Sequence, residues 1–123
     1  MKIIDFHAHI YPPKIAEKAS LSTGDFYDIK PAHTGTGEEL LSVGKNAGIS
    51  EFVLLPVATK PEQVHHINQF ILDEVKLHSE FHGFGTLHPD NENMPAETDF
   101  IIKSGLQGIK LHPDTQRFNM DDR

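Results

Sequence analysis

The chain has 123 residues, with 11 Lys or Arg against 18 Asp or Glu, so its formal net charge is −7. This acidic balance gives no electrostatic support for binding to nucleic acid or to an anionic membrane surface. There is no cysteine, which excludes disulfides and thiolate metal ligands, and no apolar run is long enough to cross a bilayer. We therefore expect a single cytoplasmic domain over residues 1–123.

Four segments have the composition of β-strands. They are rich in β-branched, aromatic or other apolar residues, and they cover residues 2–6, 51–57, 81–87 and 108–112. Such short strands at regular intervals are typical of a sheet whose strands are joined by helices.

Helical patterns separate the later strands. The clearest covers residues 60–80, where apolar residues recur every three or four positions, and two shorter ones cover 38–48 and 95–104. Residues 20–37 are polar and rich in Gly, without a steady period, and this composition predicts a loop that covers the active site. The alternation of strands and helices predicts an α/β fold of right-handed, parallel β/α units.

Two histidines, His7 and His9, directly follow the first strand, in a chain that has nine. Because side chains alternate along a strand, Asp5, His7 and His9 are expected on one face, and the apolar residues between them on the face that packs against helices. Imidazoles at i and i+2 lie about 6.5–7 Å apart along a strand, so both rings can turn toward one divalent cation. We therefore predict that His7 and His9 are metal ligands, with simple exposure at the start of a loop as the alternative.

Further candidate residues lie at the ends of the third and fourth strands. Lys110 and His112 alternate with apolar residues, so they are expected to point into the same interior as the two metal ligands. The alternative is that Lys110 extends to solvent and His112 caps a turn. His88, at the end of the third strand, is a weaker candidate for the pocket. The tetrapeptide LHPD occurs at both strand ends, at 87–90 and 111–114, and each Asp is expected to cap the segment that follows.

Three motifs, "DFHAHI" at the start, "GFGTLHPD" in the middle and "GLQGIKLHPDTQRFNMDD" near the end, resemble the amidohydrolase-related family of metal-dependent hydrolases. The resemblance covers nearly the whole chain and implies a TIM-type (β/α)8 barrel with its site at the carboxyl ends of the strands. It also implies that His7 and His9 bind a divalent metal, zinc in the first place and manganese in the second, and that Lys110 and His112 line the pocket. The implied reaction is attack of a metal-activated water on a small amide, lactone or related substrate, or a decarboxylation.

A complete barrel of this type has about 250 residues, so the four predicted strands are expected to form its amino-terminal half. The catalytic residues that the family carries on later strands have no counterpart here, and we expect this chain alone to be inactive. Its open strand edges favour self-association. Two alternatives stay open: a metal-dependent phosphoesterase with a His-x-His site, and a non-catalytic, metal-binding half-barrel.

Overall fold

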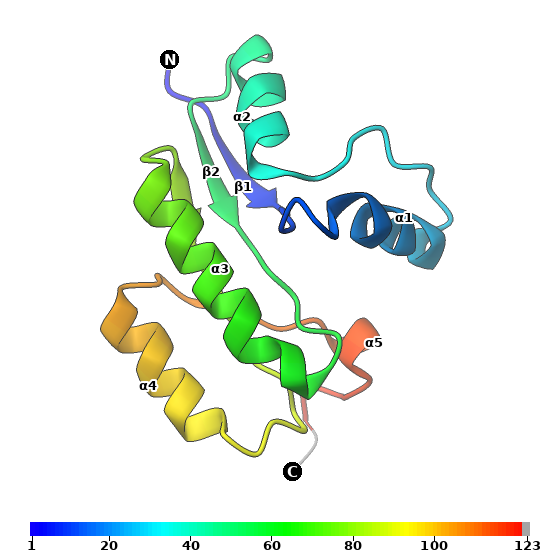
Figure 1. The fold of residues 1–123 in the computed structure, drawn as a ribbon, viewed down its shortest axis with the longest axis vertical. Coiled ribbons are helices and arrows are strands. Elements are labelled where there is room, and N and C mark those ends of the chain that lie inside the picture. The colour runs from blue at the N-terminus through cyan, green and yellow to red at the C-terminus, as the bar shows by residue number, and fades with distance from the viewer. Residues whose placement is uncertain (122–123) are drawn as a thin grey trace.

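The computed structural model describes residues 1–121, which form a mixed α/β fold (Figure 1). The strands are β1 (Ile4–Ala8), β2 (Glu51–Leu54), β3 (Phe81–Gly83), β4 (Gly85–Thr86) and β5 (Ile109–Lys110). The helices are α1 (Ala16–Tyr27), α2 (Gly37–Asn46), α3 (Val64–Leu77), α4 (Met94–Ser104) and α5 (Pro113–Gln116), with a 3-10 turn, η1 (Pro61–Gln63), before α3. None of the helices in this described part is long and apolar enough to cross a membrane.

All strand pairs are parallel. β1, β2 and β3 form one sheet in that order, and β4 pairs with β5 in a second sheet. Phe84 alone separates β3 from β4, and its N–H donates to the carbonyl of Leu54 (3.0 Å), whereas the N–H of Gly85 donates to the carbonyl of Gly108 (2.8 Å). The hydrogen bonds thus pass from β2 to β5 across one interrupted strand. The predicted α/β fold with parallel strands is confirmed.

Helices α2, α3 and α4 cover one face of the strands. Phe52 and Phe81 are registered partners on β2 and β3, and both belong to the core with Ile71 of α3 and Ile101 of α4. Burial of these side chains supplies most of the driving force for folding. The fit is close enough to require glycine at Gly83, where a Cβ would lie 2.7 Å from the Cγ2 atom of Ile71.

The opposite face carries polar groups at the amino ends of the strands. Glu51 forms an ion pair with Lys2 and accepts a hydrogen bond from Nε2 of His82 at 2.8 Å. The side-chain amide of Gln107 lies 3.4 Å from Nδ1 of the same ring. This chain of contacts, which we call the amino-end network (Lys2, Glu51, His82 and Gln107), links β1, β2, β3 and the segment before β5.

A register shift in β1 changes which of its side chains share a face. Asp5 is registered with Phe52, and Ala8 with Leu54, so a longer stretch of β1 lies beside a shorter stretch of β2. Registered partners in parallel strands point to the same side, and both partners on β2 belong to the helix-covered core. Asp5 and Ala8 therefore lie on one face, which an unbroken strand does not allow for residues three apart.

The prediction that Asp5 shares a face with His7 and His9 is consequently wrong, because this irregularity interrupts the alternation on which it rested. The expectation that the apolar residues of β1 pack against helices is also wrong for two of them. Ile4 and Phe6 are 45% and 69% exposed.

The segment predicted as a loop over 20–37 is helical as far as Tyr27, so that prediction is wrong for its first part, and the connection covers 28–36. Helix α1 leaves many of its large apolar residues exposed, and therefore shows no buried stripe in the sequence. Gly24 is needed within it, because a Cβ there would lie 2.5 Å from the carbonyl oxygen of Ile29 in the returning chain. Figure 1 shows α1 projecting to one side, away from α3 and α4.

The other predicted helices are confirmed as α2, as η1 with α3, and as α4. The first strand is shifted by two residues, from the predicted 2–6 to Ile4–Ala8, so that His7 lies within it, and the other strands are shorter than predicted. The predicted strand 81–87 is divided at Phe84, and the predicted strand 108–112 pairs over two residues before Pro113 starts α5. These short strands place several polar side chains at the carboxyl edge of the sheet.

Candidate metal site at the carboxyl ends of the strands

His7 and His9 lie together at the carboxyl end of β1. Their ring centroids are 4.9 Å apart, and the ring planes are inclined by 60°. The residue between them, Ala8, is buried, and its carbonyl accepts a hydrogen bond from the N–H of Leu55 at 2.9 Å. This backbone contact with the next strand anchors the pair, so that two nitrogen donors lie side by side at a fixed position.

The environment of His9 favours its neutral form. Both His7 and His9 are exposed residues. Partial loss of solvent around the His9 ring is the largest cause that lowers its pKa below the ordinary value of 6.5, followed by the charge of His7 and, more weakly, the charges of Lys110 and His112. A hydrogen bond to the backbone of Leu55 acts in the opposite direction. That bond occupies one ring nitrogen and leaves the other as a metal ligand, since only the deprotonated nitrogen can bind a metal.

Asp5 contacts the histidine pair through the backbone of His7. Its Oδ1 accepts the backbone N–H of His7 at 3.0 Å, which holds the irregular part of β1 in place. Its contact with the pair is therefore through the backbone, and it acts as an anchor of the strand end.

Lys110 lies half-buried on β5, registered with Thr86 of β4. Its charge contributes to the lowered pKa of His9, so the fold brings the two side chains near each other. Within residues 1–121 no ion pair involves Lys110. It thus leaves a positive charge without an acidic partner at this edge.

Both ring nitrogens of His112 form hydrogen bonds. Its Nδ1 accepts the N–H of Thr115 at 3.4 Å and so caps α5, which was the alternative considered for this residue. Its Nε2 lies 2.6 Å from the hydroxyl of Tyr27 at the end of α1. The sequence gives no signal for Tyr27, because the segment that contains it reads as a loop.

His88 is 5% exposed and has a structural role. Its Nδ1 accepts the N–H of Asp90 at 3.2 Å, which closes the turn after β4. In both copies of LHPD the histidine, and not the aspartate, accepts the capping hydrogen bond. The prediction that each Asp caps the next segment is therefore wrong, because the imidazole of the preceding His accepts the hydrogen bond that was expected for the Asp side chain.

Two buried polar residues beside the LHPD copies hold the carboxyl edge together. The hydroxyl of Thr86 accepts the N–H of Ala58 (3.2 Å) and donates to the carbonyl of Lys110 (3.1 Å). The side-chain amide of Gln116 donates to the carbonyls of Leu87 (2.6 Å) and Ala58 (2.9 Å). These side chains replace the ladder hydrogen bonds where the strands stop pairing. Both lie within the quoted motifs, but no periodicity or spacing predicts this role for either of them.

Within residues 1–121 no group of three or more His, Cys, Asp or Glu side chains is arranged to hold a metal ion. The pair of His7 and His9 therefore offers two of the three or four protein ligands that zinc usually takes. Two neutral imidazoles fit zinc and other metals that accept nitrogen ligands. The remaining ligands would have to come from solvent or from groups outside the described residues.

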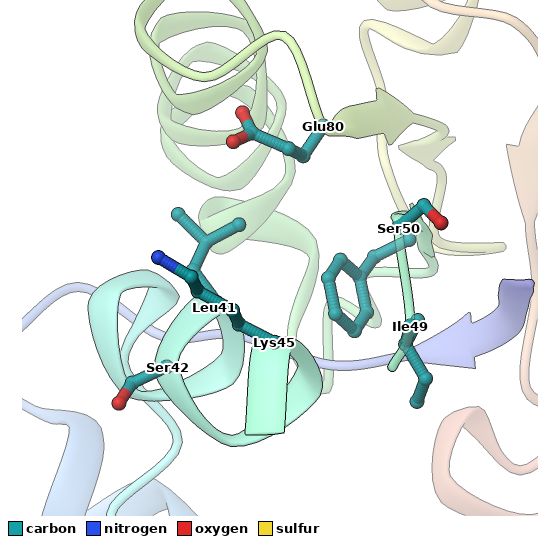
Figure 2. Close-up of a pocket in the computed structure, with 7 residues that line it drawn as sticks. Leu41, Ser42, Lys45, Ile49, Ser50 and Glu80 are labelled. Atoms are coloured by element: carbon teal, nitrogen blue, oxygen red, sulfur yellow. The ribbon is translucent and has the colours of Figure 1, made fainter. Parts of the chain in front are cut away.

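A depression of about 260 Å³ lies at the other end of the sheet, beside the start of β2 (Figure 2). It is lined by the end of α2, by the residues that lead into β2 and by Glu80. Figure 2 shows Lys45 on the helix and Glu80 on the segment that leads into the neighbouring strand. This depression is remote from the histidine pair, because the strands are parallel and their carboxyl ends all lie at the opposite edge.

Comparisons with models of protein families, with curated proteins and with solved structures find no match for this chain.

Proposed function

We propose that this chain is the amino-terminal part of a metal-dependent hydrolase of the amidohydrolase-related type. The observation that carries the proposal is the meeting of two imidazoles, His7 and His9, with ring centroids 4.9 Å apart at the carboxyl end of a parallel strand. Parallel α/β folds place their catalytic groups at this edge.

The residues of the chain have separate tasks in this proposal. His7 and His9 hold the metal, and the lowered pKa of His9 reduces the competition between the metal and a proton. A divalent ion at such a pair, when bound, acidifies water and polarises a carbonyl group. Lys110 supplies a positive charge near His9 that stabilises negative charge on a substrate oxygen.

We also propose that the strands form half of a TIM-type barrel. Each strand neighbours the preceding one in the chain, and all are parallel, which is the order that such a barrel requires. The edges of β1 and β5 have no strand partner within residues 1–121, so the missing strands would come from further chain or from a second copy. Measurement of the mass in solution by light scattering distinguishes a monomer from a self-associated form.

A non-catalytic, metal-binding role is the second candidate for this chain by itself. It is favoured by the lack of a third ligand beside His7 and His9 within residues 1–121. A phosphoesterase has less support, because it needs several basic residues to hold a phosphate, and Lys110 and Arg117 are the ones that this edge offers.

Calorimetric titration of the metal-free chain with zinc tests the proposal. We expect one zinc per chain, and a loss of affinity of at least about 100-fold when His7 and His9 are both replaced by Ala. His66→Ala is the matched control, because this exposed histidine lies beside His65 on α3 with ring centroids 6.3 Å apart, and we expect no change. Equal affinity in the double variant and the wild type would contradict the proposal.

Hydrolysis assays on the zinc-loaded chain test whether it is active by itself. Turnover of a simple lactone or amide by residues 1–123 alone would contradict the expectation that this chain is inactive without further strands. Stoichiometric zinc without turnover is expected for both the half-barrel and the non-catalytic candidate. Addition of the missing half then restores activity in the first case and not in the second.

A further inference from the structure

A second depression, also of about 260 Å³, lies beside His112 at the carboxyl edge of the sheet. Phe26 and Tyr27 of α1 form one wall, and Asp114, Thr115 and Arg117 form the other. The ring of Phe26 meets that of His112 edge-on, with centroids 6.4 Å apart. This depression, which we call the α1–α5 pocket, therefore adjoins the residues that surround the histidine pair.

The hydrogen bonds of His112 determine whether the hydroxyl of Tyr27 can donate its proton to a ligand. A backbone N–H can only donate, so Nδ1 of His112 must accept from Thr115 and carries no proton. The proton of the neutral ring is then on Nε2, which donates to the hydroxyl oxygen of Tyr27 at 2.6 Å. The phenolic proton of Tyr27 is left to donate to another acceptor in the α1–α5 pocket.

Arg117 supplies a second donor in the same pocket. It ends α5 with a φ of 56°, a left-handed conformation that non-glycine residues adopt at an energetic cost and that is frequent at binding sites. No ion pair involves Arg117 within the described residues, although Asp114 lines the same pocket. A planar guanidinium without a partner is suited to a carboxylate.

We propose that the α1–α5 pocket binds a small aromatic carboxylic acid. The carboxylate accepts hydrogen bonds from Arg117 and from the phenol of Tyr27, and the ring of the acid packs against Phe26. The role of this pocket as the substrate subsite of a hydrolase rests on the proposed function, whereas the binding of the acid needs no metal.

Titration of the full, metal-free chain with benzoate, followed by two-dimensional NMR of the backbone amides, tests this proposal. We expect shifts confined to the end of α1 and to α5. Arg117→Gln is expected to weaken binding about tenfold and Tyr27→Phe a few-fold, whereas Arg117→Lys keeps part of the affinity. Asp114→Asn is expected to tighten binding a few-fold, because it removes a negative charge beside the carboxylate.

A matched control accompanies these variants. Lys45→Gln removes a cation from the depression of similar volume at the opposite edge and should leave benzoate binding unchanged. The ¹⁵N signals of His112 give an independent readout. Tyr27→Phe should change the Nε2 signal, because the acceptor of its proton is lost, whereas the contact of Thr115 with Nδ1 keeps the proton on Nε2.

Benzoate shifts spread over the whole surface, or equal affinity in wild type, Arg117→Gln and Tyr27→Phe, would overturn the proposal. Spectra of each variant in the absence of benzoate show whether it folds. Benzoate binding at the pocket without zinc binding at His7 and His9 would contradict the hydrolase proposal alone. Zinc binding without benzoate binding would contradict this inference alone.

Discussion

The two ends of the same parallel sheet use histidine in opposite ways. At the amino ends, His82 lies between Glu51 and Gln107, and each ring nitrogen has a partner. At the carboxyl end of β1, His7 and His9 face each other, and within residues 1–121 no carboxylate forms an ion pair with either ring. Histidine is thus paired with a carboxylate at the amino edge, whereas at the carboxyl edge His7 and His9 have no carboxylate partner within residues 1–121.

The shifts in pKa follow this difference. Hydrogen bonds from Lys2 and then from His82 hold the pKa of Glu51 below its ordinary value of 4.5. Partial loss of solvent around the ring, and then the charge of His7, lowers the pKa of His9. The amino-end network pairs its own charges, whereas at the carboxyl edge His7, His9 and Lys110 form no ion pair within residues 1–121. This contrast separates a structural network from a candidate binding site.

The largest expected effect comes from the support beneath the carboxyl edge. Asn68 is fully buried and bonds both backbone groups of Thr86, accepting from its N–H at 2.7 Å and donating to its carbonyl at 3.0 Å. Asn68→Leu leaves these groups unpaired, so we expect a loss of about 2–4 kcal/mol in the free energy of unfolding, measured with urea. Gln107→Ala in the amino-end network is the control and should cost less than about 0.5 kcal/mol. Similar losses in both variants would show that the two edges are supported alike.

The amino-end network predicts an acid-sensitive contribution from Glu51. Because its pKa is lower in the folded than in the unfolded chain, its stabilisation is complete above about pH 4.5 and is lost as the pH falls through the folded pKa. Glu51→Gln should therefore lose stability relative to wild type at about pH 6, with the difference shrinking toward about pH 3. Urea unfolding across this range measures the difference, and a gap that does not depend on pH would refute the assignment.

The histidine pair predicts a second window, nearer neutrality. The pKa of His9 is lower in the folded chain than its ordinary 6.5, so the unfolded chain takes up this proton first and stability falls as the pH drops below about 6.5. His9→Asn should therefore lose less stability than wild type between about pH 7.5 and about pH 5.5, in buffer free of metal. If the free energy of unfolding changed with pH equally in the two proteins, the pKa of His9 would not be lowered in the folded chain.

The smallest effects concern the neighbours of His9. His7→Asn removes the largest of the three charge contributions, so it should raise the pKa of His9 more than Lys110→Gln does. Titration of the His9 ring by proton NMR measures both changes. Lys45→Gln, at the opposite edge, should leave this pKa unchanged. A larger rise in the pKa of His9 for Lys110→Gln than for His7→Asn would contradict this order of the charge contributions.

Local pattern was enough to locate the helices with buried stripes and the histidine pair. The apolar periodicity of 60–80 predicted η1 and α3 because burial on one side of a helix leaves a repeat in the sequence. The spacing of His7 and His9 predicted that the two rings lie together, and their centroids are 4.9 Å apart although the register shift in β1 affects the same segment. Both inferences depend on contacts between residues close in the chain.

What the sequence determined by itself is therefore the parallel α/β order and the two adjacent imidazoles. The tertiary structure alone decided that Asp5 turns to the helix-covered face, that α1 is a helix, and that Tyr27 reaches His112. The first and the third depend on a partner far away in the chain, namely the register with β2 and the contact with His112 after β5, whereas α1 is closed by the nearby connection that packs on Gly24. Contacts over such separations leave no period in the sequence, because the two partners are brought together by folding and not by spacing.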